Sequence, residues 1–141
     1  MALAALMVLA VADVAAAASR EDELKRVINR NTGFAHMTRG MNMYTLIALR
    51  SCVTDADLPV LRRLLFDRDY VTQLSAAGVL VDMGPGGRAT LALPEATEYR
   101  ARSTIQDALR EADDPARRPL SAYPFDERER KRLRGCGAFA Y

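Results

Sequence analysis

The feature that most constrains the fold is a helical spacing of apolar residues that runs from residue 19 to about residue 114. Two stretches illustrate this spacing with their apolar positions: Leu58, Leu61, Leu64 and Leu65 in one, and Tyr99, Ile105, Ala108 and Leu109 in the other. Such spacing indicates amphipathic helices, and we find no convincing run of alternating strand pattern. The sequence therefore predicts an all-α fold, and 141 residues with 50% hydrophobic composition are enough for one globular domain.

Capping residues, glycine and proline divide this region into expected helices. Ser19, with acidic residues in the turn after it, marks the start of the first helix, and Thr54 or Asp55 caps the third. Gly84 ends the fourth, because glycine takes a left-handed conformation after a helix and Pro85 cannot continue it. The expected helices cover residues 19–31, 41–52, 55–65, 86–93 and 95–114, and the fourth of the six begins at residues 67–69 and runs through residue 83.

Leucines recur along the chain with a nearly constant separation. Leu49, Leu80 and Leu109 lie 31 and 29 residues apart in the longer helices, and Leu61 and Leu91 lie 30 apart in the shorter ones. A period of this length is typical of helix-turn-helix units stacked in series.

One of these units resembles a repeat of the HEAT type. The resemblance covers residues 55–93 best and rests on an acid pair, a small pair and a closing glycine: Asp67 and Asp69, Val71, Ala76 and Ala77, Leu80 and Gly84. HEAT-type repeats are scaffolding and protein-binding modules. The resemblance therefore implies a short array of stacked antiparallel helix pairs that offers an interaction surface to an unidentified protein.

The first 18 residues are apolar after Met1 except for Asp13. This is the outline of a secretory signal peptide, with Ala16 and Ala18 in the small-residue positions of a cleavage site before Ser19, or with cleavage one residue earlier. The alternatives are an alanine-rich helix packed on the domain and an uncleaved membrane anchor. We expect three parts: a signal peptide (1–18), a helical-repeat domain (19–114) and a proline-broken loop with an arginine-rich tail (115–141). The expected location is periplasmic or secreted, and the alternative locations are membrane-anchored, through the N-terminal segment, or cytoplasmic.

Export would give the two cysteines a meaning. In an oxidising compartment Cys52 and Cys136 form the one possible intramolecular disulfide, which would hold the C-terminal tail beside the second expected helix. In a reducing compartment the expectation is a buried Cys52 and a thiol in the tail. A flexible tail cysteine also allows pairing with another chain.

Composition excludes several function classes. The formal charge of +2, from 20 Lys and Arg against 18 Asp and Glu, is too balanced to indicate a nucleic-acid-binding or membrane-surface protein. One histidine, His36, and two cysteines are too few for a zinc site built from His and Cys. We therefore expect no metal and no cofactor.

The motifs that resemble catalytic or binding elements have simpler explanations. The glycine-rich segment 84–88 lacks the Gly-Lys-Ser/Thr ending of a phosphate loop, so a helix-terminating turn explains it better. The acid pairs Asp55 with Asp57 and Asp67 with Asp69 stand at helix starts, where capping accounts for them. We therefore predict that the protein is not an enzyme.

Two surfaces are candidates for contact with partners. We expect Arg62, Arg63, Tyr70 and Gln73 to be exposed and to bind a protein, and this is the leading hypothesis. The second hypothesis is an accessory protein whose tail contacts anionic lipid or nucleic acid through Arg128, Lys131, Arg132 and Arg134, although a solvated, ion-paired helix is the default reading of that segment. A small enzyme ranks third, and the oligomeric state stays open.

Overall fold

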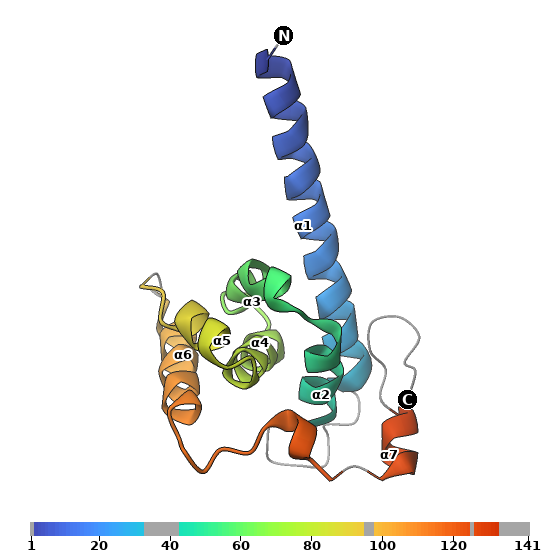
Figure 1. The fold of residues 1–141 in the computed structure, drawn as a ribbon, viewed down its shortest axis with the longest axis vertical. Coiled ribbons are helices and arrows are strands. Elements are labelled where there is room, and N and C mark those ends of the chain that lie inside the picture. The colour runs from blue at the N-terminus through green and yellow to red at the C-terminus, as the bar shows by residue number, and fades with distance from the viewer. Residues whose placement is uncertain (1, 33–42, 95–97, 125, 133–141) are drawn as a thin grey trace.

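The computed structural model describes residues 2–32, 43–94, 98–124 and 126–132. All regular elements within these ranges are helices, which confirms the all-α prediction (Figure 1). The α-helices are α1 (Ala2–Thr32), α2 (Met43–Cys52), α3 (Leu58–Leu64), α4 (Tyr70–Asp82), α5 (Pro85–Leu91), α6 (Tyr99–Ala112) and α7 (Glu127–Arg132), and the 3-10 helices are η2 (Asp55–Asp57) and η3 (Leu120–Ala122).

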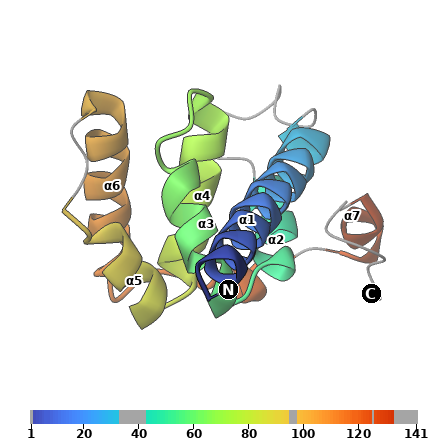
Figure 2. The ribbon, with the colours of Figure 1, turned by 90° about the horizontal axis from the view of Figure 1, so that it is seen from above.

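The first six α-helices pack around α4. Helix α1 packs on α2 and α3 on α4, whereas α5 and α6 each pack on α4 more than on each other, and α6, α4 and α2 follow one another across the molecule (Figure 2). The odd-numbered helices α1, α3 and α5 also contact one another in that order, and so do α2, α4 and α6. Helix α4 touches all five of the others and therefore lies at the centre.

The leucines that recur in the sequence lie in the core. Leu49, Leu61, Leu80 and Leu91 are fully buried, and Leu109 is partly buried against the same cluster. Each of the helices α2 to α6 contributes one of them. The regular leucine spacing thus reflects helices that all turn a large apolar residue toward one continuous core.

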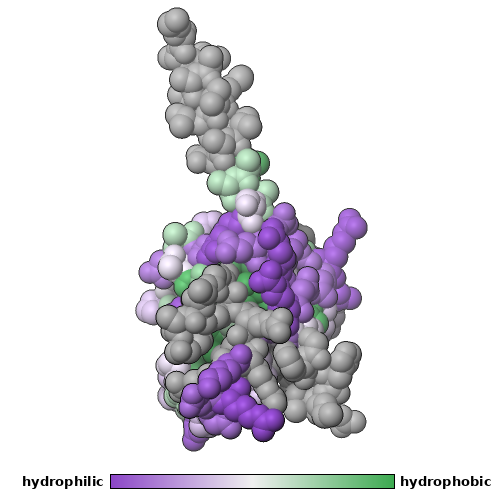
Figure 3. All heavy atoms as spheres, turned by 90° about the vertical axis from the view of Figure 1, so that its right-hand side faces the viewer, coloured by the Kyte–Doolittle hydropathy of each residue, from purple (hydrophilic) through white to green (hydrophobic). Residues whose placement is uncertain are grey.

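The predicted start of the first helix at Ser19 is wrong, because α1 is continuous from Ala2 to Thr32. Alanine, leucine and methionine are strong helix formers, and neither glycine nor proline interrupts the segment, so nothing in it ends the helix. Residues 14–16, 18 and 19 are exposed, Val14 to 70%, and this part of α1 projects from the surface of the body (Figures 1 and 3). The alternative of an N-terminal helix packed on the domain therefore fails for residues 14–19.

The turn between α4 and α5 is built on two glycines with different roles. Gly84 has a φ of +71°, as expected for the glycine that ends a helix, and Pro85 opens α5. Gly87 lies inside α5, where a Cβ would come within 1.9 Å of the Leu80 carbonyl oxygen. The absence of a side chain at Gly87 is what allows α5 to lie directly on α4.

The proline-broken loop is held on the helical body by one carboxylate. Asp82, at the end of α4, accepts hydrogen bonds from the backbone N–H of Leu120 at 2.7 Å, from Arg50 Nε at 3.0 Å and from Arg117 Nη1 at 3.4 Å. Leu120 itself packs against the core. The segment up to η3 is thereby joined to α2 and α4.

Candidate functional site

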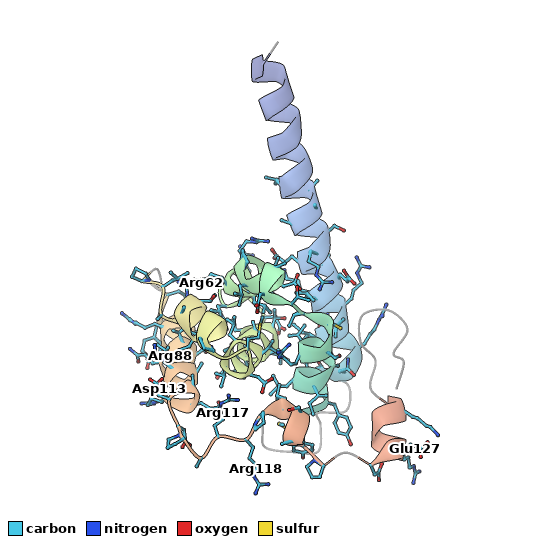
Figure 4. The ribbon with its side chains drawn as sticks, viewed as in Figure 1. Arg62, Arg88, Asp113, Arg117, Arg118 and Glu127 are labelled. Carbon is cyan, nitrogen blue, oxygen red and sulfur yellow. The ribbon has the colours of Figure 1, made fainter. Side chains whose placement is uncertain are left out.

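Arg62 is not an exposed contact residue as predicted, because only 9% of it is accessible. Its guanidinium extends from α3 toward α5 (Figure 4), where Nη2 donates to the Leu93 carbonyl at 2.9 Å and Nη1 to the Thr90 carbonyl at 3.3 Å. It also lies over the Phe66 ring, 5.0 Å from the centroid. Arg62 therefore adds donors to two carbonyl groups at the end of α5, where the helix leaves backbone acceptors over, although the Thr90 carbonyl also accepts from Leu93 N at 3.4 Å.

Gln73 is also buried rather than exposed, with 3% of its surface accessible. The cause is the central place of α4, which is covered by neighbours on most of its circumference. Because Gln73 lies one turn before Ala77 and two turns before Leu80, which are both buried, it shares their face of α4 and is covered with them.

The two remaining predicted contact residues are exposed but touch different elements. Arg63 forms an ion pair with Glu21 of α1, with Nε 3.2 Å from Oε2. Tyr70, which is 48% exposed, lies at the start of α4 beneath Arg100 of α6. Of the four residues predicted together, only Tyr70 belongs to the pocket described next.

The pocket lies where α4 begins and along the first turns of α6. It has a volume of about 270 Å³ and is lined by Tyr70, Tyr99, Arg100, Ser103, Thr104 and Asp107. We call these six residues the tyrosine pocket. Tyr99 was predicted at an apolar, inward position, which is wrong: it is 77% exposed. The pocket therefore presents two tyrosine side chains and a guanidinium to solvent.

Acidic N-caps place the two tyrosines at equivalent positions. The Asp69 carboxylate accepts hydrogen bonds from Thr72 N at 2.9 Å and from Thr72 Oγ1 at 2.7 Å, and Tyr70 is the first residue of α4. Glu98 accepts from Ala101 N at 2.6 Å and from Arg100 N at 2.9 Å, and Tyr99 is the first residue of α6.

This pattern was the sequence signal for the pocket that spacing alone missed. An acid followed by tyrosine occurs twice, at 69–70 and 98–99, with a separation that falls within the leucine period.

The hydrogen bonds from the Ala101 and Arg100 N–H groups stabilise the ionised form of the Glu98 carboxyl and hold its pKa below the usual range.

Arginines cover both tyrosine rings. The Arg100 guanidinium carbon lies 5.5 Å from the centroid of Tyr70, and that of Arg102 lies 6.0 Å from the centroid of Tyr99. No carboxylate among the described residues forms an ion pair with either arginine, whereas Asp107 pairs with Arg110. The guanidinium groups next to the tyrosine pocket thus keep donors available for an external acceptor.

The acid pairs that resemble metal ligands serve the helix interface instead. Asp57 receives two hydrogen bonds from Arg20 of α1, with Nε to Oδ1 at 2.8 Å and Nη2 to Oδ2 at 3.0 Å, and this pairing holds the pKa of Asp57 below its usual value. Burial opposes ionisation of Asp67, but the ion pair with Lys25 at 2.7 Å and the hydrogen bond from Asp69 N at 2.9 Å together outweigh it, and the pKa of Asp67 is lowered. In the described ranges, no group of three or more His, Cys, Asp or Glu side chains is arranged to hold a metal ion.

The arginine-rich tail is only partly described. Helix α7 carries Arg128, which is exposed, and Lys131, whose Nζ lies 3.0 Å from Glu127 Oε1 in an exposed pair. The side chain of Arg132, and all of Arg134 and Cys136, lie outside the described residues. The Cys136 half of the predicted Cys52–Cys136 disulfide therefore lies there, and so does His36.

The remaining observations concern membranes and known proteins. Within the ranges described, no helix combines the length and the hydropathy needed to cross a bilayer. The sequence matches no protein-family model and no curated protein, and no solved structure matches the fold.

Proposed function

We propose that this protein is an exported protein-binding module, built as a short array of helix pairs similar to HEAT-type repeats, that captures its partner at the tyrosine pocket. The observation that carries the proposal is the pair of tyrosines at equivalent positions of α4 and α6, each under an arginine. The order in which the pairs contact one another supports a repeat array, because each pair touches mainly its neighbours.

The composition and size of the pocket favour a protein partner. Tyrosine and arginine are enriched at the residues that contribute most to protein–protein affinity. A volume of about 270 Å³ lies below the range of roughly 300–1,000 Å³ that is usual for small-molecule sites, and it suits a single side chain of a partner. Since Arg100 and Arg102 have donors to offer, we propose that this side chain is acidic.

We propose binding rather than catalysis at this site. The cation of the pocket is Arg100, and an arginine stays protonated throughout the physiological range. The carboxylate, Asp107, is already paired with Arg110. These groups suit recognition of a fixed charge better than transfer of a proton.

A double substitution in the pocket tests this proposal. We expect Arg100→Gln combined with Tyr70→Ser to weaken binding of acidic peptides, selected from a random display library on the wild-type protein, at least tenfold. Arg118→Gln removes an equally exposed arginine from the loop and serves as the control. Selected peptides that lack an excess of Asp and Glu, or that bind the double variant equally well, contradict the proposal.

A second candidate function is contact of the tail with an anionic surface. It is favoured by the exposed Arg128 and Lys131 of α7. Deletion of residues 125–141 separates the two proposals, because it removes tail-dependent binding to vesicles of anionic lipid or to nucleic acid and leaves the pocket in place. Such binding should also fall steeply with salt concentration.

Export is tested by the mass of the chain recovered from bacterial cells that express residues 1–141. We propose cleavage before Ser19, because small residues precede it and the helix is exposed there. Ala16→Leu with Ala18→Leu should abolish cleavage at this bond, whereas Ala12→Leu should not. An intact N-terminus in the wild-type chain overturns the export proposal and leaves the binding proposal standing.

A further inference from the structure

We infer that Ser19 is a latent helix N-cap, which is inactive inside α1 and becomes active when residues 1–18 are removed. The biological occasion for this switch rests on the proposed export. Its physical basis is independent of export and lies in the packing of α1 and in the residues that follow Ser19.

The contacts of α1 with the body begin immediately after Ser19. Residues 14–16, 18 and 19 are exposed and Ala17 is half-buried. In the described part of α1, the first side chain with hydrogen bonds to another segment is that of Arg20, which donates to Asp57 and to the Cys52 carbonyl at 2.6 Å. The first fully buried residue is Leu24. Removal of residues 1–18 therefore breaks none of these hydrogen bonds.

The residues from Ser19 onward have the order of a helix start, although they lie in the middle of a helix. Serine is among the best N-cap residues, because its hydroxyl accepts a hydrogen bond from a backbone N–H of the first turn. Three acids follow at residues 21–23, where negative charge is favourable at a helix N-terminus. Arg20 stands before these acids and is paired with Asp57 and Glu23, and Lys25 and Arg26 come after them.

In the uncut helix these features have no use. The N–H groups of residues 21 and 22 donate to carbonyls one turn earlier, so they need no cap. At an exposed position inside a helix, serine is a poorer residue than alanine. Once residues 1–18 are gone, the same N–H groups lose their acceptors, and the Ser19 hydroxyl is placed to receive one of them.

The inference predicts that one substitution has different effects in two forms of the chain. In a chain that begins at Ser19, we expect Ser19→Ala to lower the Tm by about 2–5 °C, as loss of an N-cap does in a domain of this size. In the chain of residues 1–141, Ser19→Ala should cause no loss of Tm. Ser19→Asn, which keeps a capping side chain, should restore the Tm of the shortened chain.

The same measurements contain the results that overturn the inference. A shortened chain that is unfolded, or that melts more than about 10 °C below the full chain, shows that residues 1–18 are part of the folded body. An equal effect of Ser19→Ala in both chains shows that the serine does not act as a cap. Neither result depends on whether cells export the protein, so failure of this inference and failure of the export proposal are distinguishable.

Discussion

At the scale of single residues, Gly87 shows how the lack of a side chain sets the distance between two helices. A Cβ at this position would lie 1.9 Å from the Leu80 carbonyl oxygen and 3.0 Å from the Met83 Cβ, and the first of these contacts is with backbone, which cannot turn aside. Gly86, its neighbour in the same helix, meets only the end of the Leu58 side chain at 3.4 Å.

We therefore expect Gly87→Ala to lower the free energy of unfolding by about 2–4 kcal/mol, because α5 must move away from α4 to make room for the methyl group. Gly86→Ala should instead raise it by about 0.5–1 kcal/mol, since alanine is the better helix former at an exposed position. Urea denaturation measures both variants. Equal effects at the two glycines would mean that α5 does not lie on Leu80.

A second prediction at this scale concerns acid stability. The pairing with Arg20 lowers the pKa of Asp57 in the folded protein relative to the unfolded chain. The stability that this pair contributes is therefore present above the unfolded pKa of about 4 and is lost as the pH falls through the lower folded value. Asp57→Asn should flatten this part of the curve of unfolding free energy between pH 5 and pH 2. Parallel curves for the wild type and the variant would contradict the assignment.

At the scale of elements, the sequence predicted five of the six packed helices to within a few residues, because each has a clear apolar stripe and a stop signal. Two features of neighbouring elements were beyond it. The start signal at Ser19 is local, and it does not act while strong helix formers precede it. Burial of Arg62 depends on its contact with the end of α5, which spacing within α3 does not reveal. Gln73, by contrast, was expected to be exposed although its spacing places it on the face of Ala77 and Leu80.

The candidate site was predicted only in part for the same reason. Tyr70 was identified as a contact residue, whereas Tyr99 was assigned to the interior because it follows the apolar spacing of α6. Its exposure follows from the geometry of the helix, because with 3.6 residues per turn Tyr99 lies on the side of α6 opposite the buried Ala101 and Ala108. The pocket arises from two helix starts brought together by packing, and neither start contains it alone.

Packing between elements is tested at Leu80, which is fully buried on α4. We expect Leu80→Ala to lower the free energy of unfolding by about 2–5 kcal/mol, because the removed methyl groups leave a cavity between the helices. Leu93→Ala serves as the control, since Leu93 is about half exposed. A loss below about 0.5 kcal/mol at Leu80 would contradict the packing of α4.

At the scale of the whole molecule, ion pairs join parts of the chain that are far apart in sequence. Arg20 and Lys25 of α1 form ion pairs with Asp57 and Asp67, which stand before and after α3. Asp82 of α4 pairs with Arg50 of α2 and accepts the Leu120 N–H, so it joins η3 to both helices. These contacts bring the beginning and the later part of the described chain onto one helical core.

We expect Asp82→Asn to loosen the loop more than the helices. The change leaves an amide in place of the carboxylate that accepts the Leu120 N–H and pairs with two arginines. Hydrogen exchange at the Leu120 amide should become at least tenfold faster, while amides in the middle of α4 keep most of their protection. Asp113→Asn, which removes the exposed pair with Arg88, is the control (Figure 4). Unchanged exchange at Leu120 would show that Asp82 does not hold the loop.

The projecting part of α1 also has a mechanical consequence. An α-helix rises about 1.5 Å per residue, so the stretch from Ala2 to Ser19 extends over about 27 Å. Because it is continuous with the packed half of the same helix, it acts as a stiff spacer rather than a loose tether. In the uncut chain, a partner bound at the far end of this helix would hold the folded body at a fixed distance and in a fixed orientation. Cleavage before Ser19 would remove this connection.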